Sequence, residues 1–221
     1  MGKKQHYVPQ FYLKNFSSSS QKNIGVFRFN NQRFIPNASI KDIAYRDNLY
    51  DDDNAIEKEL ALREGKWKHM LDIFLGRNIT IDIFEWLNQH AEEFVKRLFE
   101  FFAVTEARTT QSGDSISFFY QSLEKKIGGE MLPENYKEYF GDLEYVKKHP
   151  NLILLKIALE NIPYFAGLDF IFIINATKHG FITSDAPVIN LNPYYIKRKY
   201  NRNFGLVSMG LQKFLPISPR F

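Results

Sequence analysis

Cysteine is absent from this chain of 221 residues. Its absence excludes a disulfide-bonded scaffold, a thiolate nucleophile and a zinc site with cysteine ligands. A chain without cysteine fits a reducing compartment, and we expect a cytoplasmic protein. Long apolar runs are also lacking, because the longest, at 162–174, contains Pro163, Gly167 and Asp169. The sequence therefore predicts neither a membrane span nor a secretory signal peptide.

Common enzyme motifs are missing as well. The chain has no Gly-x-x-x-x-Gly-Lys phosphate loop, no Gly-x-Gly-x-x-Gly turn, no His-Glu-x-x-His pair and no zinc-finger spacing. These absences exclude the usual nucleotide-binding and zinc-binding signatures. Ser184 lacks the Gly-x-Ser-x-Gly surroundings of a nucleophile elbow, which disfavours a serine hydrolase.

What the chain does hold is apolar and aromatic material. Apolar residues make up 44% of it, with 21 Phe and 12 Tyr, which suffices for one full core. We expect a single domain over residues 1–221. Its ending, Phe214–Phe221, has the pattern of a strand entered but not completed, which indicates a chain shortened at its C-terminus.

The net charge of +4 does not decide the partner. Basic residues and tyrosines alternate in the run 195–202, and this run has two interpretations. It is either a solvated surface loop or a segment that grips a phosphate backbone and stacks bases. Nucleic acid or a nucleotide is therefore a candidate partner.

Apolar residues at helical spacing predict helices throughout the middle of the chain. The first is capped by Asn54 and ended by Gly76, and the second, longer helix runs from Thr80 to Arg108. Three further helices are expected at 115–126, 133–147 and 151–161. We expect the first two helices to share one core, made of Trp67, Trp86, Phe94, Leu98 and Phe102.

Strand patterns lie at both ends. A β-hairpin is predicted over 24–35, and short apolar runs predict strands at 170–174, 180–183 and 188–191. The predicted fold class is α+β, with a central helical bundle packed on a sheet formed by N-terminal and C-terminal strands.

The most specific run of the chain is Gln5-His6-Tyr7-Val8-Pro9-Gln10-Phe11-Tyr12, which puts polar tips beside a large apolar surface. Through this run the chain resembles an uncharacterised, largely bacterial family, domain of unknown function 4238. The resemblance continues through Glu57 and Glu64, Arg108-Thr109, Ser184-Asp185-Ala186-Pro187-Val188 and Pro216-Ile217-Ser218. It implies no activity, so the roles below come from chemistry alone.

Glu57 and Glu64 are seven residues apart and return to nearly the same helix face. With His6 and Asp185 they form a hard-ligand set suited to Mg²⁺ or Mn²⁺, in which Glu57 and Glu64 are the metal ligands. The alternative is that both carboxylates are solvated, with Glu64 four residues before Lys68.

We expect His6 and Asp185 to be catalytic and to lie near each other, with His6 buried and hydrogen-bonded. The alternatives are a structural histidine and a turn closed by the aspartate itself. Candidate substrate-binding residues are Tyr7, Gln10, Tyr12 and Arg108. The guanidinium of Arg108 suits an anion clamp or, alternatively, only the helix dipole.

Three hypotheses follow for the function. The first is a metal-dependent phosphodiesterase or nuclease in bacterial defence. The second is a non-catalytic module that binds an anion or a nucleotide. The third is a structural interaction domain, in which the N-terminal motif serves packing.

Overall fold

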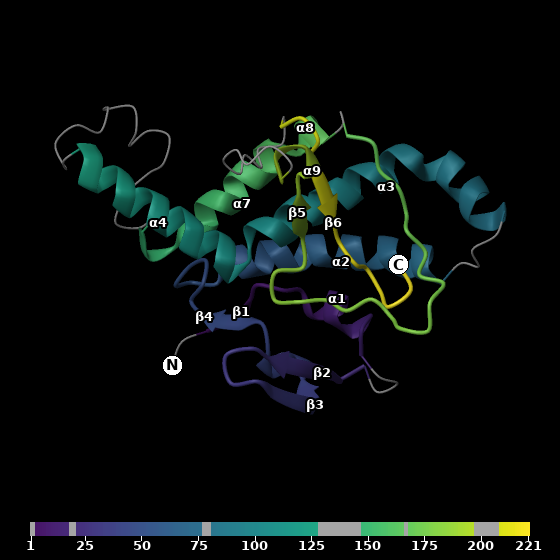
Figure 1. Ribbon diagram of the computed structural model, residues 1–221, viewed down its shortest axis with the longest axis horizontal. Coiled ribbons are helices and arrows are strands. Elements are labelled where there is room, and N and C mark those ends of the chain that lie inside the picture. The colour runs from purple at the N-terminus through teal and green to yellow at the C-terminus, as the bar shows by residue number, and fades with distance from the viewer. Residues whose placement is uncertain (1–2, 18–20, 77–80, 128–146, 166–167, 197–207) are drawn as a thin grey trace.

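The computed structural model describes residues 3–17, 21–76, 81–127, 147–165, 168–196 and 208–221. Two long helices, α2 (Ala55–Leu75) and α3 (Ile81–Ala107), pack on each other at the centre of the molecule (Figure 1). Helix α7 (Pro150–Glu160) contacts α3, α4 (Thr110–Ile127) and α8 (Ile162–Phe165). Among the described residues, no helix is both long and apolar enough to cross a membrane.

The described helices agree with the predicted ones, with shifted bounds in two cases. The first helix spans the predicted residues, whereas α4 begins five residues earlier than expected and α7 begins at Pro150. The helix expected at 133–147 lies almost wholly outside the described residues, as do Thr80 and most of the basic run 195–202.

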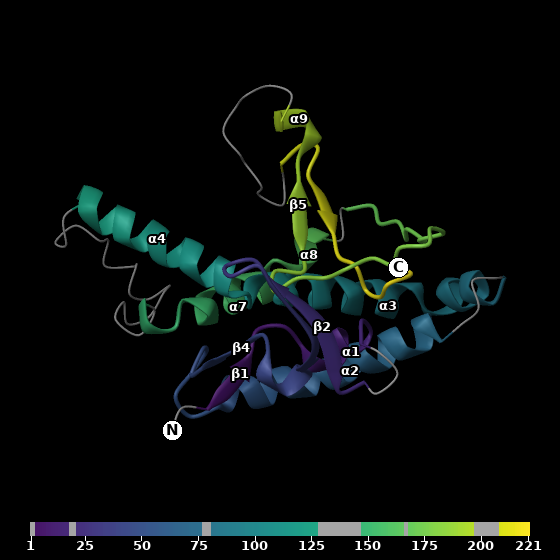
Figure 2. The same ribbon diagram turned by 60° about the horizontal axis from the view of Figure 1, so that its bottom comes forward.

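Within the described residues, the strands form three separate two-stranded antiparallel sheets. The chain is α+β, as predicted, but in the described part its terminal strands do not share one sheet. Figure 2 shows the C-terminal hairpin above α3 and the N-terminal sheets below it. The pairs are β1 (Lys4–His6) with β4 (Tyr45–Asp47), β2 (Asn23–Arg28) with β3 (Arg33–Ser39), and β5 (Ile189–Leu191) with β6 (Gln212–Phe214). Short helices α1 (Gln10–Lys14), η1 (Ile40–Asp42) and α9 (Pro193–Ile196) complete the described elements.

Helix α2 begins where Asn54 was predicted to cap it, but other side chains form the cap. Asn54 adopts a left-handed conformation (φ 71°), and its side chain makes no capping bond. The carboxylate of Asp51 instead accepts the amides of Ile56 (2.6 Å) and Asn54 (3.1 Å), and Asp53 accepts the amide of Ala55 (3.0 Å). An acidic group three residues before the expected cap thus satisfies the first free N–H groups of the helix.

The core forms between α2 and α3 and is closed by the N-terminal segment. The predicted residues Trp67, Phe94 and Leu98 are buried, and Trp86 and Phe102 pack against the same cluster in partly buried positions. Val8, Tyr12 and Leu13 belong to this cluster too, which makes the N-terminal run part of the main core.

The apolar run 170–174 differs from the predicted buried strand. It forms no ladder with another strand, and Ile171 is 82% exposed. Phe172 does reach the core, with its ring 4.5 Å from that of Phe74. The backbone on either side of the turn at 175–180 bonds instead to the C-terminal segment, since Asn175 N donates to Arg220 O and Phe181 N to Pro219 O. The segment 180–183, also predicted as a strand, is likewise irregular.

Candidate functional site

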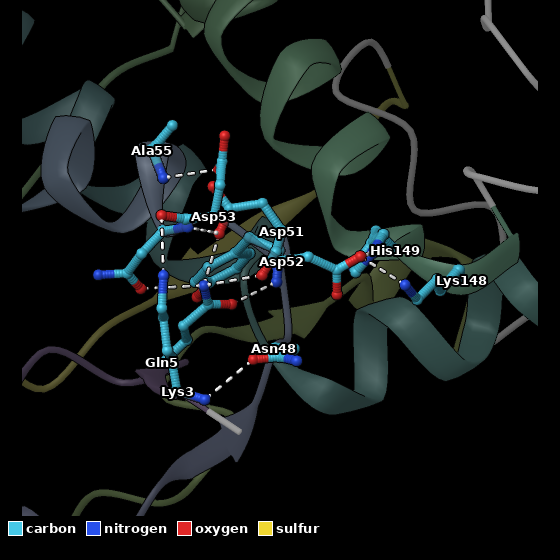
Figure 3. Close-up of polar contacts among 11 residues, drawn as sticks. Lys3, Gln5, Asn48, Asp51, Asp52, Asp53, Ala55, Lys148 and His149 are labelled. Atoms are coloured by element: carbon cyan, nitrogen blue, oxygen red, sulfur yellow. Dashed lines mark hydrogen bonds and ion pairs between the residues drawn. The ribbon is translucent and has the colours of Figure 1, made fainter. Parts of the chain in front are cut away.

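The side chain of Gln5 connects β1 to the start of α2 through hydrogen bonds (Figure 3). Its side chain is fully buried. The carbonyl oxygen accepts the amide of Tyr50 at 2.7 Å, and the amide nitrogen donates to the carboxylate and the backbone carbonyl of Asp51 and to Asn54. No spacing pattern in the sequence predicts this role for Gln5, because a single buried amide has no periodic partner.

Arg108 lies at the centre of a buried polar cluster. Its guanidinium is fully buried and donates to Tyr50 Oη (3.0 Å), to Glu64 Oε1 (2.6 Å) and to the backbone carbonyl of His6. Tyr50 Oη also donates to the same His6 carbonyl at 3.0 Å. We name these four residues and Glu57 the Arg108 cluster.

The electrostatics of this cluster follow from burial and from the guanidinium. Burial raises the pKa of Tyr50 to about 12, although the charge of Arg108 opposes the shift. Burial alone would lower the pKa of Arg108, but Tyr50 and Glu64 outweigh it and raise the pKa. Arg108 therefore stays charged, and its protein partners satisfy it.

The two glutamates lie on one face of α2, as their spacing predicts, and the charge of Arg108 acts on both. Glu64 is ion-paired with Arg108. Burial raises the pKa of Glu57; the charge of Arg108 opposes this shift, and the charge of Glu64 adds to it. The buried Oε2 atom of Glu57 has no hydrogen-bond partner in the described structure. Over the described residues no three His, Asp or Glu side chains are grouped as metal ligands. The cation beside these carboxylates is Arg108.

The His6 ring is buried, as expected, and Gln10 Nε2 lies 3.4 Å from its nitrogens. The Tyr45 ring packs against the His6 ring in a tilted arrangement, with 5.8 Å between the two ring centroids. Burial lowers the pKa of His6, and the positive charges of Arg108 and Lys4 lower it further. A hydrogen bond with the Lys41 backbone and the negative charge of Glu64 act in the opposite direction but are outweighed. The ring is therefore neutral at physiological pH.

Tyr12 and Asn15 join the N-terminal motif to the C-terminal segment. Tyr12 Oη donates to Pro216 O at 2.6 Å and bonds Thr183 Oγ1 at 2.7 Å, and Asn15 Nδ2 donates to Ile217 O at 3.0 Å. The Tyr12 hydroxyl is thus used within the fold, and burial raises its pKa.

The turn that carries Asp185 follows Thr183, which bonds Tyr12 of the N-terminal motif. Burial raises the pKa of Tyr7, and the negative charge of Asp185 raises it further, whereas Arg46 lowers it. The Asp185 side chain is exposed. The side chain that closes the turn at Asp185 is Ser184. Its hydroxyl donates to Ala186 O (2.9 Å) and accepts from Ala186 N (3.2 Å). The carboxylate of Asp185 is consequently open to a partner.

A second polar group joins α3 to the β5–β6 hairpin. Glu106 accepts Asn190 Nδ2 at 2.5 Å and Lys213 Nζ at 2.7 Å, and Lys213 also donates to Asn190 Oδ1 at 2.7 Å. Asn190 and Lys213 are cross-strand partners. No local pattern in the sequence predicts this group, because Asn190 and Lys213 are 84 and 107 positions from Glu106.

The charges are distributed unevenly along the chain. The first 41 residues contain no Asp or Glu, whereas the remaining residues hold 22 Lys and Arg and 25 Asp and Glu. All seven basic side chains of the first 41 residues are exposed. We name them the basic N-terminal region: Lys3, Lys4, Lys14, Lys22, Arg28, Arg33 and Lys41.

The sequence was compared with known families, proteins and structures. A family model described as "Protein of unknown function (DUF4238)" matches residues 4–221, nearly the whole chain. No curated protein and no solved structure matches it.

Proposed function

This chain belongs to the DUF4238 family of proteins of unknown function, and we propose that it binds nucleic acid through its basic N-terminal region. One observation carries the proposal: seven exposed cations occur in 41 residues without a single acidic side chain. Such a segment attracts a polyanion whatever its sequence.

The ion pairs of this region leave part of its charge available. Lys4 pairs with Asp42 at 2.8 Å, and Lys3 Nζ donates to the carbonyl of Asp53 at 3.1 Å. Arg28 and Arg33 are cross-strand partners at the end of the β2–β3 hairpin, and neither has an ion pair with a described residue. Two guanidiniums side by side suit successive phosphates of one strand, since each offers a planar fork of donors.

The contacts of the buried site do not favour substrate binding by Arg108 or Tyr12. Arg108, proposed from the sequence as an anion clamp, already donates to three protein acceptors, and the Tyr12 hydroxyl is also bonded within the fold. These contacts favour packing roles for both residues. The anion-binding role therefore moves to the exposed cations.

The test is fluorescence anisotropy of a labelled oligonucleotide across a salt series. We expect Kd to rise with salt, and Arg28→Gln/Arg33→Gln to reduce the slope of log Kd against log salt by up to about 1.4 for a single strand. Lys66→Gln/Lys96→Gln is the matched control, because it removes the same charge from the groove that Glu59 and Glu93 line between α2 and α3. Salt-independent binding, or equal effects of both double variants, would contradict the proposal.

A second candidate function is hydrolysis of a phosphodiester. Two observations favour it: Asp185 has an open carboxylate beside Tyr7, and Glu57 has an unpartnered oxygen near His6. In this hypothesis His6 and Asp185 are catalytic, and Tyr7 and Gln10 contact the substrate. Glu57 and Glu64 would bind Mg²⁺ or Mn²⁺ in exchange for the ion pair between Glu64 and Arg108. Nuclease activity in a defence setting would be its biological use.

A further inference from the structure

The β2–β3 hairpin carries three aromatic rings that the fold leaves uncovered. Phe27, Phe34 and Phe29 are 49%, 62% and 86% exposed. Phe27 and Phe34 are cross-strand partners, and the Phe27 ring meets the edge of the Phe29 ring at 5.1 Å. The three rings therefore form one surface, which we name the aromatic face.

The alternation of the strand explains why these rings lie outside. Ile24 is buried and Val26 packs on the core, so that face of β2 is turned inward. Gly25 and Phe27 then point to solvent. A β-carbon at Gly25 would lie 3.4 Å from the Phe34 ring, so the ring lies across the glycine and is held there. Figure 1 shows the hairpin at the bottom of the molecule, on the side away from α3 and α4.

Charge and polarity around the aromatic face indicate what covers it. Arg28 and Arg33 pair directly next to the Phe27–Phe34 pair, and the hairpin contains no acidic residue. A second copy of this face would bring like charges together. The tip is Asn30-Asn31-Gln32, whereas a loop that enters a lipid bilayer needs apolar residues at its tip.

We propose that the aromatic face stacks unpaired bases, so that the hairpin binds single-stranded nucleic acid in preference to a duplex. The proposal rests on the nucleic-acid binding proposed above and specifies its ligand. Bases of a single strand can leave their neighbours and stack on phenylalanine rings. Arg28 and Arg33 form the adjacent cross-strand pair, so their side chains leave the opposite face of the hairpin, and from there their charge attracts the phosphates of the strand. Bases in a duplex are already stacked and paired, and they offer the rings no free face.

The experiment measures anisotropy with a labelled oligo(dT) of about 12 nucleotides and a mixed-sequence duplex of the same length. The test variant is Phe27→Leu/Phe29→Leu/Phe34→Leu, which keeps apolar side chains and removes the rings. Phe118→Leu, at a 72% exposed position on α4, is the control. Thermal melting of each variant verifies the fold.

We expect the parent to bind the single strand more tightly than the duplex. Loss of the three rings should weaken single-strand binding about 5- to 150-fold for each base stacked and leave duplex binding unchanged. Arg28→Gln/Arg33→Gln should weaken both. Phe118→Leu should change neither.

The failures can be told apart. If the triple variant keeps the parent's single-strand affinity, or the parent binds both forms equally, stacking is wrong while nucleic-acid binding survives. If the parent binds neither form at low salt, both proposals fall. A final measurement tests binding to vesicles of phosphatidylcholine and phosphatidylserine. If the triple variant loses vesicle binding but keeps oligonucleotide binding, the aromatic face binds lipid and the proposal is overturned.

Discussion

At the scale of single residues, Arg108 shows how a buried charge holds several segments at once. It joins β1, the segment before α2, and α2 itself to the end of α3, through His6, Tyr50 and Glu64. Removing one partner of such a buried group leaves the others without compensation.

We therefore expect Arg108→Met to lower the free energy of unfolding by about 3–5 kcal/mol, as measured by urea denaturation. Arg63→Met is the control, because Arg63 pairs with Glu59 and Glu100 in a partly exposed position and should cost about 0–1 kcal/mol. Equal losses in the two variants would show that Arg108 has no special structural role.

Glu57 gives a prediction about pH. Its pKa in the folded protein is raised above 4.5, so the folded state holds this proton more tightly than the unfolded chain does. The stability that this provides is present below pH 4.5 and is lost as the pH rises through the folded pKa. Glu57→Gln should therefore be more stable than the parent at neutral pH.

The stability curves of both proteins against pH provide the measurement, and the gain should vanish below pH 4.5. His6 acts in the opposite sense: its lowered pKa gives stability above pH 6.5 that is lost on acidification. His6 is present in both proteins, so its effect cancels in the difference. A variant less stable than the parent at neutral pH would disprove the assignment.

Asp185 tests the catalytic alternative. Because its side chain is exposed and Ser184 closes its turn, Asp185→Asn should keep the melting temperature. If the site hydrolyses phosphodiesters, the variant should lose Mn²⁺-dependent cleavage of single- and double-stranded nucleic acid. Full activity in the folded variant would remove Asp185 from the catalytic set. The same variant should lower the pKa of Tyr7, since a negative charge disappears.

At the scale of elements, the start of α2 depends on Asp51. Its carboxylate accepts two helix amides and the buried amide of Gln5. Asp51→Ala should cost about 2–4 kcal/mol, the sum of a lost cap and an unsatisfied buried donor. Asp53→Ala removes one exposed capping bond and should cost clearly less in the same denaturation assay. The reverse order would mean that Asp53 is the principal cap.

The α2–α3 packing depends on Phe94. This ring is 2% exposed and lies 5.4 Å from the rings of Phe74 and Trp86. Phe94→Ala should lower stability by about 3–5 kcal/mol. An unchanged thermal transition would refute this packing.

Helices were the elements that the sequence predicted best, because their signal is local. The apolar spacing of α2 and the glycine after it determined its bounds, and the spacing of Glu57 and Glu64 placed both on one face. The cap of α2 was assigned to Asn54 instead of Asp51. The left-handed turn at Asn54 folds the chain so that the carboxylate of Asp51 accepts the amide of Ile56, and the sequence does not show this turn. The run at 170–174 was misassigned because it packs through the rings of Phe170 and Phe172, leaves Ile171 exposed and has no partner strand among the described residues.

At the scale of the whole molecule, the candidate site could be predicted only in outline. Motif resemblance selected His6, Glu57, Glu64, Arg108 and Asp185, and all five lie around the N-terminal segment. Their bonding partners could not be deduced, since Tyr50, Thr183 and Pro216 approach from distant parts of the chain. The aromatic face was overlooked because exposure is a property of the folded surface and not of a strand pattern.

The bonds from Tyr12 to Pro216 and from Asn15 to Ile217 span 204 and 202 positions. During synthesis at about 5–20 residues per second, these N-terminal side chains wait roughly 10–40 s for their acceptors to be made. Over that interval the basic N-terminal region is already synthesised, while the side chains of Tyr12 and Asn15 lack their final partners. The nascent chain thus presents a cluster of cations, which attracts polyanions, before its own fold is complete, next to a ribosome made largely of RNA.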